Sequence, residues 1–421
     1  MATPPPAATP MAWPNFSAGE DPVETLIKLS RFYGCDPAFV LAGGGNTSVK
    51  IGERLYVKAS GTALATIDRS GFVILDRQKL NEIADADFGT EVESREAQYK
   101  TAIMNARLEI SGGGPRPSVE SLLHHLVPGR FVVHTHATLV NALTCSIRGV
   151  QLAQECLGDA CLWVEFVDPG YTLGRVLKEN LARYRAQHGG NTPGPKAIIM
   201  ANHGMIVGGD TPEEVRANTD FVVACVAAKL GGGTRWQSAG WGMPIQTPLS
   251  RTDAAVLRGT LESALQTLLR GPEVGAPVVA FDDSPLIWAF VNSALGHKAA
   301  LGGPLNPDQI VYCTSFPLWF EPRNGEEPAA VVARLREQWA GHKRQYKYDP
   351  RIILVPGLGL LATGESASTA QTALQLYRDT IQVMSGAILL GGIQPLSAAK
   401  REFIENWEVE AYRRQIAKKG M

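Results

Sequence analysis

The sequence predicts an α/β protein with two domains, the second a smaller and degenerate copy of part of the first. Three observations predict this arrangement: β-prone runs separated by glycine turns, helices with recognisable caps, and a strand, turn and helix pattern that occurs twice. The chain has 421 residues, which is enough for two domains of ordinary size.

Composition and charge exclude several classes of partner. Hydrophobic residues make up 45% and charged residues 19% of the chain, the balance of a soluble globular protein. The formal net charge is -1, so we expect neither nucleic acid nor an anionic membrane as a partner. No apolar run reaches the roughly 18 residues of a membrane span. The six cysteines form no C-x-x-C pair, which favours reduced thiols and a cytoplasmic location.

The N-terminal part predicts a tail, a helix and a group of strands. Residues 1–20 begin with a run rich in proline and alanine, and we expect a disordered tail. Asp21 followed by proline is typical of a helix start, and this helix is expected to stop near Gly34. Residues 39–73 alternate β-prone runs with glycine turns, which predicts neighbouring strands. A further helical segment is expected around residues 96–108.

The middle of the chain mixes strands and helices. Residues 118–127 predict a short helix with Ser118 as a candidate N-cap. The β-prone runs at residues 130–137 and 196–204 predict buried strands. The Thr-Pro-Glu-Glu sequence that starts at Thr211 predicts a capped helix over the apolar positions that follow.

A segment rich in glycine, serine and proline divides the chain. We expect a first domain over residues 21–235, a linker over 236–255 and a second domain over 256–421. The segment from Arg351 aligns without gaps with the segment from Lys196, and both read as strand, glycine turn and capped helix. We therefore expect the second domain to repeat part of the first.

Two histidines in one β-prone run are the first candidates for chemistry. Residues two apart on a strand project from the same face, so His134 and His136 can share a metal ion at about 2.0–2.1 Å. A polar strand edge is the alternative for an isolated H-x-H pair, and it is the commoner one.

His203 and Glu120 strengthen the metal hypothesis. His203 ends a β-prone run just before Gly204, at a junction from which its side chain can reach a neighbouring strand. Glu120 lies in the first turn of the helix that leads into the histidine strand. Taken singly, His203 is typical of a hydrogen-bonded core histidine and Glu120 of a surface helix cap. Together, three imidazoles and a carboxylate predict a catalytic zinc site with a position open to substrate.

These residues also resemble a known family, the class II aldolase/adducin family, which includes fuculose-phosphate and rhamnulose-phosphate aldolases. The motifs that carry the resemblance stand in family order: Gly44-Gly45-Asn46-Thr47-Ser48, Lys58-Ala59-Ser60-Gly61-Thr62, Pro117-Ser118-Val119-Glu120, His134-Thr135-His136 and Asn202-His203-Gly204. The C-terminal region, with Gly303-Pro304-Leu305 and Phe316-Pro317-Leu318-Trp319, is similar to the aldolase portion of a longer enzyme in which a rhamnulose-phosphate aldolase is fused to an alcohol dehydrogenase.

The resemblance implies a class II aldolase-like first domain: three α/β/α layers around a central, mainly antiparallel sheet. The smaller second domain is expected to be aldolase-like but without a metal site. The family implies His134, His136 and His203 as ligands of Zn²⁺ or another divalent ion, and Glu120 as the base. It further implies a homo-oligomer, a dimer or tetramer.

The resemblance also implies a sugar-phosphate substrate. Asn46, Ser60, Gly61 and Ser118 fall where the family grips the phosphate, and exposed backbone N–H groups with hydroxyl donors suit a dianion. Val119 departs from the family, where the sugar-phosphate aldolases often have another hydroxyl. This departure weakens the expected grip on phosphate unless the nearby Lys58 compensates.

The implied reaction is cleavage of a ketose 1-phosphate, of rhamnulose or fuculose type, by retro-aldol chemistry. Glu120 moves the proton and the metal stabilises an enediolate. The second acid in the family is an aromatic hydroxyl from near the C-terminus or from a partner chain, and both Tyr377 and Tyr412 are candidates.

Three alternatives stay open. A sugar-phosphate epimerase or decarboxylase would use the same metal site, although Glu120 favours aldol cleavage over epimerisation. A non-catalytic, adducin-like scaffold has no need of three histidines and a glutamate, and scaffolding is the leading interpretation only for the second domain. The glycines from Gly357 match G-x-G-x-x-[G/A], but the expected helix starts near Ser366, too late for a dinucleotide-binding turn.

Overall fold

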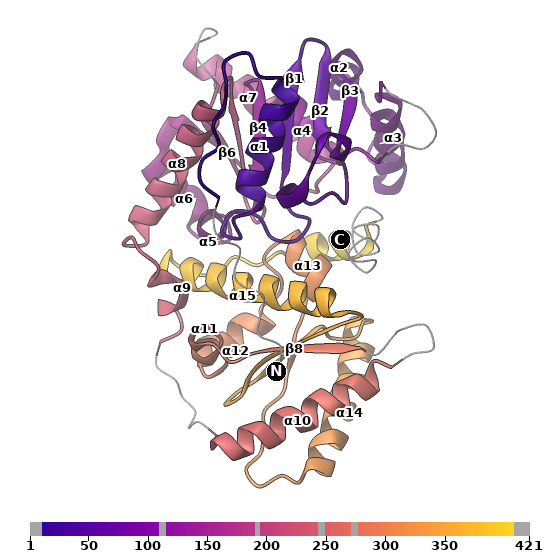
Figure 1. Ribbon diagram of the computed structural model, residues 1–421, viewed down its shortest axis with the longest axis vertical. Coiled ribbons are helices and arrows are strands. Elements are labelled where there is room, and N and C mark those ends of the chain that lie inside the picture. Colours follow the sequence, from indigo (N-terminus) through magenta and orange to yellow (C-terminus); the bar gives the residue numbers. More distant parts are fainter. Residues whose placement is uncertain (1–10, 109–114, 190–193, 243–248, 271–276, 408–421) are drawn as a thin grey trace. The chain divides into compact units, whose positions relative to one another are not determined.

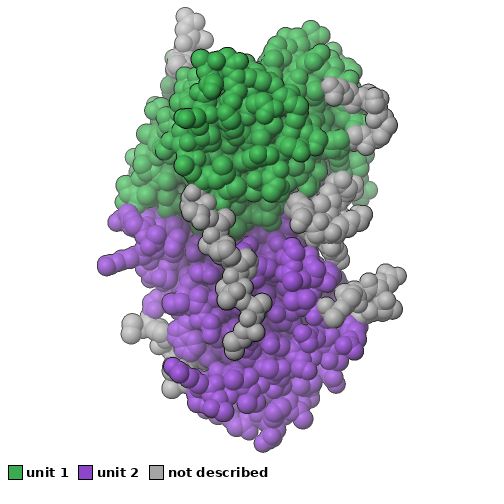
Figure 2. All heavy atoms as spheres, viewed as in Figure 1, with its two compact units in different colours: residues 1–144, 149–229 green, residues 145–148, 230–421 purple. Residues whose placement is uncertain are grey.

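The computed structural model describes residues 11–108, 115–189, 194–242, 249–270 and 277–407. The chain divides into two compact units, which Figure 2 colours separately. Unit 1 comprises Met1–Thr144 and Gly149–Lys229, and unit 2 comprises Cys145–Arg148 and Leu230–Met421. No helix in the described part of the chain is long and apolar enough to cross a membrane.

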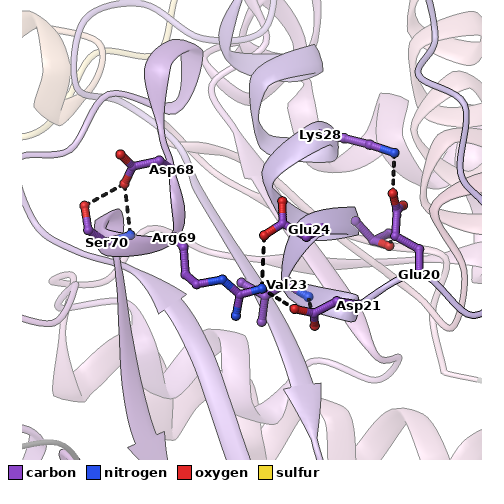
Figure 3. A network of polar contacts seen from close by, with 9 residues as sticks. Glu20, Asp21, Val23, Glu24, Lys28, Asp68, Arg69 and Ser70 are labelled. Carbon is purple, nitrogen blue, oxygen red and sulfur yellow. Dashed lines mark hydrogen bonds and ion pairs between the residues drawn. The ribbon is translucent and has the colours of Figure 1, made fainter.

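Helix α1 (Pro22–Gly34) begins where the Asp-Pro pair predicts. The Asp21 carboxylate accepts the N–H of Val23 at 3.1 Å, and proline occupies the first helical turn. Arg69 binds the carboxylates of both Asp21 and Glu24, which joins the start of α1 to a neighbouring turn (Figure 3). These charges are about half exposed, so the ion pairs add little beyond the cap itself.

Part of the expected N-terminal tail packs against α1. The Trp13 ring lies edge-on to Phe32 with centroids 4.8 Å apart, and the Arg216 guanidinium lies 4.8 Å from the centre of the same indole. The prediction of disorder over residues 1–20 is therefore wrong for the segment around Trp13. Residues 1–10 lie outside the described part of the chain, as does the glycine run at 112–114.

A sheet of seven strands forms the centre of unit 1, in the order β3-β2-β1-β4-β7-β6-β5. Only the β5–β6 pair is parallel, which confirms the expectation of a mainly antiparallel sheet. The strands are β1 (Asn46–Ile51), β2 (Arg54–Lys58), β3 (Phe72–Asp76), β4 (Phe131–Thr135), β5 (Cys161–Val164), β6 (Ala197–Met200) and β7 (Gly204–Gly209).

Helices cover both faces of this sheet, so unit 1 has the three expected layers (Figure 1). Two apolar clusters pack α2, α3, α4 and α7 against one face, and α1 and α8 contact strands from the other. The remaining helices and 3₁₀ turns of unit 1 are α2 (Arg77–Asp85), α3 (Val92–Asn105), α4 (Ser121–Leu126), α5 (Thr138–Thr144), α6 (Gly149–Leu157), α7 (Tyr171–His188), α8 (Pro212–Lys229), η1 (Leu64–Thr66), η2 (Arg69–Gly71) and η3 (Gly158–Ala160).

Two predicted caps have different outcomes. Thr211 caps α8 as expected, because its hydroxyl accepts the N–H of Glu214 at 3.2 Å. The prediction that Ser118 caps α4 is wrong, since the helix begins at Ser121 and Glu120 occupies the cap position without a side-chain cap bond. The Ser118 hydroxyl instead accepts the N–H of Glu120 at 3.2 Å. Ser118 thus shapes the turn that presents the glutamate.

Unit 2 contains a four-stranded sheet in the order β8-β11-β10-β9. Helices α10 and α14 pack on one face and α15 on the other, as Figure 1 shows. Its elements are α9 (Trp236–Ala239), α10 (Arg251–Leu268), β8 (Val278–Asp282), α11 (Pro285–Val291), α12 (Ala294–Leu301), α13 (Pro307–Cys313), β9 (Leu318–Trp319), α14 (Pro328–Tyr346), β10 (Ile352–Val355), β11 (Gly359–Gly364), α15 (Ala367–Leu389) and α16 (Ala398–Asn406).

The predicted repeat holds at the level of strand register. Strands β6 and β7 with helix α8 begin and end where the ungapped alignment places β10, β11 and the start of α15. The sheet of unit 2 reproduces β4-β7-β6-β5, with the same antiparallel, antiparallel and parallel pairs. The second unit therefore repeats four strands of the first and, among its described residues, lacks counterparts of β1, β2 and β3.

The same register explains two further points of the sequence. Ile206 pairs with His134, and its counterpart Leu361 pairs with Phe281, so a phenylalanine occupies the place of a predicted metal ligand. Gly357 and Gly359 flank a turn between two antiparallel strands, and the next helix begins only after β11. This glycine motif therefore lacks the strand-to-helix turn that a dinucleotide-binding fingerprint needs.

The expected linker is partly packed into unit 2. Trp236, at the start of α9, and Trp241 are 5% and 1% exposed. The Ser385 hydroxyl on α15 donates to the Trp236 carbonyl at 2.7 Å. The glycine and proline content of this segment does not predict that its tryptophans are buried. Residues 243–248 lie outside the described part of the chain.

Candidate metal centre and active site

Strand β4 places His134 in the centre of the sheet of unit 1. Its neighbours in register are Asn46 on β1 and Ile206 on β7. The imidazole is fully buried, and its Nδ1 lies 2.8 Å from the carbonyl oxygen of Met205. Because a carbonyl only accepts, Nδ1 carries the proton and Nε2 keeps its lone pair for another partner.

His136 and His203 approach His134 from two turns. His136 lies one residue beyond the end of β4, and its N–H donates to the Phe39 carbonyl at 3.1 Å. His203 lies in the turn between β6 and β7, where Asn202 has a positive φ of 53°. The residue after His203 must be glycine, because a Cβ on Gly204 would lie 2.3 Å from the Thr135 carbonyl.

The three imidazoles converge on one point. One nitrogen from each of His134, His136 and His203 lies within 4.8 Å of the others, and the Nε2 atoms of His134 and His136 are 3.0 Å apart. Two ligands about 2.0–2.1 Å from a tetrahedral ion are about 3.3 Å from each other. The donor set and its spacing therefore fit a divalent ion of the zinc type.

Burial keeps the central histidine of the cluster in the form that can bind a metal ion. Burial lowers the pKa of His134 to about 3, an effect that the Glu120 carboxylate opposes but does not cancel. A neutral imidazole is the form that ligates a cation, so His134 is available at neutral pH without first losing a proton.

Glu120 reaches the histidines from the turn before α4. Its Oε1 lies 3.1 Å from Nε2 of His203 and 3.5 Å from Nε2 of His134. Its Oε2 accepts a hydrogen bond from Nδ2 of Asn46. Burial raises the pKa of Glu120, but the neighbouring His134, His203 and His136 outweigh it and hold the pKa well below the usual range. A carboxylate here is ionised and within reach of anything bound between the histidines.

The residues expected to hold phosphate are grouped near this carboxylate. An isolated bridge pairs Ala59 with Pro117, and the N–H of Ser60 donates to the Arg116 carbonyl at 2.8 Å. This pairing places Ser60 and Gly61 beside the segment that leads to Ser118. Gly61 has a positive φ of 84°, which glycine adopts freely. The side-chain amide of Asn46, which is also expected to hold phosphate, donates to Oε2 of Glu120.

Backbone contacts that the sequence did not reveal hold the Glu120 turn and the glycine loop. The Tyr99 hydroxyl, on α3, donates to the Val119 carbonyl at 3.0 Å and so fixes the residue before Glu120. The Lys58 ammonium is buried and donates to the Gly43 carbonyl at 3.4 Å. Both partners are carbonyls, which every residue carries, so no sequence signal marks these pairs.

Three further titratable side chains have structural roles in the described part of the chain. The rings of His124 and His125, on α4, contact Ser48 and Asn81 at 2.8 and 2.7 Å. Tyr377 is fully buried in unit 2, and its hydroxyl finds no hydrogen-bond partner among the described atoms. Tyr377 is therefore a core residue in this chain, and Tyr412 lies outside the described residues.

Comparison with known proteins identifies the family. A sequence model described as "Class II Aldolase and Adducin N-terminal domain" matches residues 24–230. A second model, "Aldolase class II, second domain", matches residues 249–413. The chain therefore belongs to the class II aldolase and adducin family, as the motifs predict.

Three individual proteins resemble the chain with sequence identities between 14% and 27%. A Bacillus subtilis (strain 168) protein named "Uncharacterized oxidoreductase YuxG" is 27% identical over 434 residues, which cover 96% of this chain and 60% of the relative. The chain thus spans less than two thirds of that protein. The N-terminal class II aldolase domain of a Thermoplasma acidophilum protein is 26% identical, with a TM-score of 0.44, and the match covers 51% of this chain and 96% of that one. The L-fuculose-1-phosphate aldolase of Thermus thermophilus is 14% identical, with a TM-score of 0.31 and coverage of 50% and 92%.

One metal ion per chain is the expected stoichiometry. The described residues of unit 2 contain no group of three or more converging metal-ligating side chains, and Phe281 and Leu358 stand where the repeat would place His134 and His203. Elemental analysis of the full chain, purified without added metal, measures this ratio directly. Two equivalents of zinc per chain would contradict the assignment of unit 2 as a copy without a site.

Proposed function

We propose that this protein is a divalent-metal-dependent aldolase that cleaves a ketose 1-phosphate of the rhamnulose or fuculose type. The observation that carries the proposal is the convergence of His134, His136 and His203 on one point, with the Glu120 carboxylate 3.1 Å from one of them. Family membership is consistent with this reaction. The proposed cofactor is Zn²⁺ or a similar ion, held by the three histidines.

The roles of the side chains follow from their chemistry. When bound, a divalent cation supplies Lewis acidity that polarises a carbonyl and stabilises the negative charge left by C–C bond cleavage. The ionised Glu120 carboxylate accepts the hydroxyl proton of the substrate when the bond breaks. Ser60, Gly61 and Ser118, together with Asn46, bind the phosphate and so fix the sugar chain over the base. The protonated Glu120 then returns the proton to C3 of the carbanionic fragment, which completes dihydroxyacetone phosphate and restores the carboxylate.

The proposal extends to organisation. We propose the domain division at residues 21–235 and 256–421, a second domain without a metal site, and assembly as a cytoplasmic homo-oligomer. A second acid from a partner chain would fit the burial of Tyr377 in its own unit. Sedimentation of the purified protein tests the assembly.

A substrate panel tests the reaction. The metal-loaded protein is incubated with ketose 1-phosphates of different stereochemistry, and released aldehyde is measured with a coupled dehydrogenase. Cleavage of one stereoisomer into dihydroxyacetone phosphate and an aldehyde is the expected result. Isomerised sugar without aldehyde would identify an epimerase, and release of CO₂ from keto-acid phosphates a decarboxylase. Neither product would agree with an aldolase.

Val119→Thr should lower KM for the phosphorylated substrate. Threonine has nearly the shape of valine and adds a hydroxyl beside Ser118, where it can donate to the phosphate. One charge-assisted hydrogen bond contributes about 1.5–3 kcal/mol, so we expect KM to fall at least about tenfold. Val119→Ala, which removes bulk without adding a donor, is the control. Equal KM values for the three proteins would show that position 119 does not face the phosphate.

A further inference from the structure

Unit 2 has a groove of about 630 Å³ beside β9, the edge strand of its sheet. We call it the β9 groove; its lining comes from β9 and the loop after it, from α12 and from α14. Phe281 and Leu358, which stand at the positions of His134 and His203, do not line this groove. The β9 groove is therefore distinct from the degenerate counterpart of the metal centre, and its volume suits a small molecule.

Gly341 lies in the middle of helix α14, where packing does not explain the lack of a side chain. Beyond the adjoining backbone, a Cβ on Gly341 would meet one described atom, Nη2 of Arg344 at 3.8 Å. Glycine within a helix costs stability relative to alanine. The helix residues that line the groove follow one another at intervals of four, three and four: Arg334, Gln338, Gly341 and Gln345. Gly341 thus keeps the centre of this stripe open to an approaching molecule.

Two side chains of the groove carry a buried polar atom without a hydrogen-bond partner among the described atoms. These atoms are Nε1 of Trp319 and Oε1 of Gln338. An indole N–H only donates and an amide oxygen only accepts, and leaving either unpaired costs stability. Both side chains are only partly buried, so a change of torsion can bring these atoms to a bound molecule. A hydroxyl group, which both donates and accepts, suits either atom.

The charges of the groove do not favour an anionic ligand. The Arg334 guanidinium binds the Glu326 carboxylate and donates to the Glu321 carbonyl at 2.8 Å, so it is already engaged. Burial lowers the pKa of His342, whose ring is therefore neutral at neutral pH. Arg323 and Glu321 are both exposed and have opposite charges. This lining is better suited to a neutral ligand than to a phosphate.

Aromatic rings complete the lining. The Trp319 indole lies beside the His297 ring, with centroids 4.6 Å apart, and Tyr346 also borders the groove. A sugar has C–H groups on its faces and hydroxyls around its edge, which match aromatic surfaces with hydrogen-bonding groups beside them. We propose that the β9 groove binds a neutral sugar, with hydroxyls paired to Trp319 and Gln338 and the ring over Gly341. This site shares no residue with the histidine cluster, and the inference does not depend on the proposed aldolase function.

The indole N–H of Trp319 reports such binding directly. Its ¹H–¹⁵N resonance, one of eight from tryptophan, is assigned by its loss in Trp319→Phe. The full-length protein is titrated with D-glucose, D-fructose, L-fucose or L-rhamnose. At least one of these sugars should move the resonance to lower field in a saturable way, because the N–H gains an acceptor. Inorganic phosphate and AMP should leave it in place. No response to any of the four sugars, or a response to phosphate or AMP, would overturn the proposal.

Two variants locate the sugar in the groove. Gly341→Leu fills the open surface and should abolish the saturable shift, while Tm rises by about 2 °C because leucine favours a helix interior. Gly259→Leu, the same change at an exposed position of α10, should gain similar stability and bind as the wild type. Gln338→Met removes the acceptor at nearly constant size and should raise Kd about tenfold. Wild-type affinity in either the folded Gly341→Leu or the folded Gln338→Met protein would overturn the proposed site.

Discussion

Glu120→Gln should lower turnover about 10²–10⁴-fold while the protein keeps its full metal content. The amide has nearly the shape of the carboxylate, and its carbonyl oxygen can still accept from Asn46 and preserve the packing around the turn. It has no basicity with which to take a proton from the substrate. Turnover of the ketose 1-phosphate and elemental analysis of the same preparation measure both effects.

The matched control is Glu213→Gln, an exposed glutamate in the first turn of α8. It makes the same chemical change away from the site and should leave turnover as in the wild type. Loss of metal in Glu120→Gln would make Glu120 a ligand of the resting ion, and undiminished turnover would place the base elsewhere.

His134→Ala should remove the metal and with it the activity. His134 is the most buried of the three histidines, and the Met205 carbonyl fixes its tautomer. Loss of a partner that only orients a metal ligand already costs about 10–100-fold in affinity or activity, so loss of the ligand should cost more than about 100-fold. Metal content by elemental analysis should fall from one equivalent to near zero.

His188→Ala is the control for this variant. His188 lies at the end of α7, where its Nδ1 contacts the Tyr184 carbonyl at 2.8 Å, so its removal should leave one metal per chain. Circular dichroism of both variants shows whether the fold is retained. Full occupancy in a folded His134→Ala protein would refute the three-histidine site.

Sequence reasoning predicted most of the local structure because local signals are strong there. The Asp21 and Thr211 caps and the glycine turns mark element boundaries through contacts within a few residues. The repeat was visible because strand, turn and cap recur in the same order from Lys196 and from Arg351. The local signal for a helix cap was wrong at Ser118. This serine stabilises the turn that presents Glu120 and does not cap the helix.

The candidate site also combines features that the sequence predicted with features that only the structure shows. Residue types and motif order were enough to select His134, His136, His203 and Glu120, because few side chains bind a metal or move a proton. The sequence also identified Asn46 and Ser60 as candidates, but it did not show which groups they contact.

Tertiary structure alone decided the contacts between these residues. The β1–β4 register brings Asn46 beside His134, and the hydrogen bond from Asn46 to Glu120 then joins the base to the proposed phosphate site. The carbonyl of Met205 orients His134, and the carbonyl of Val119 holds the turn before Glu120. Every residue carries a carbonyl and strand register is set by the whole sheet, so neither leaves a local mark in the sequence. Sequence therefore determined which groups are available for chemistry, and only the fold determined which of them hold one another.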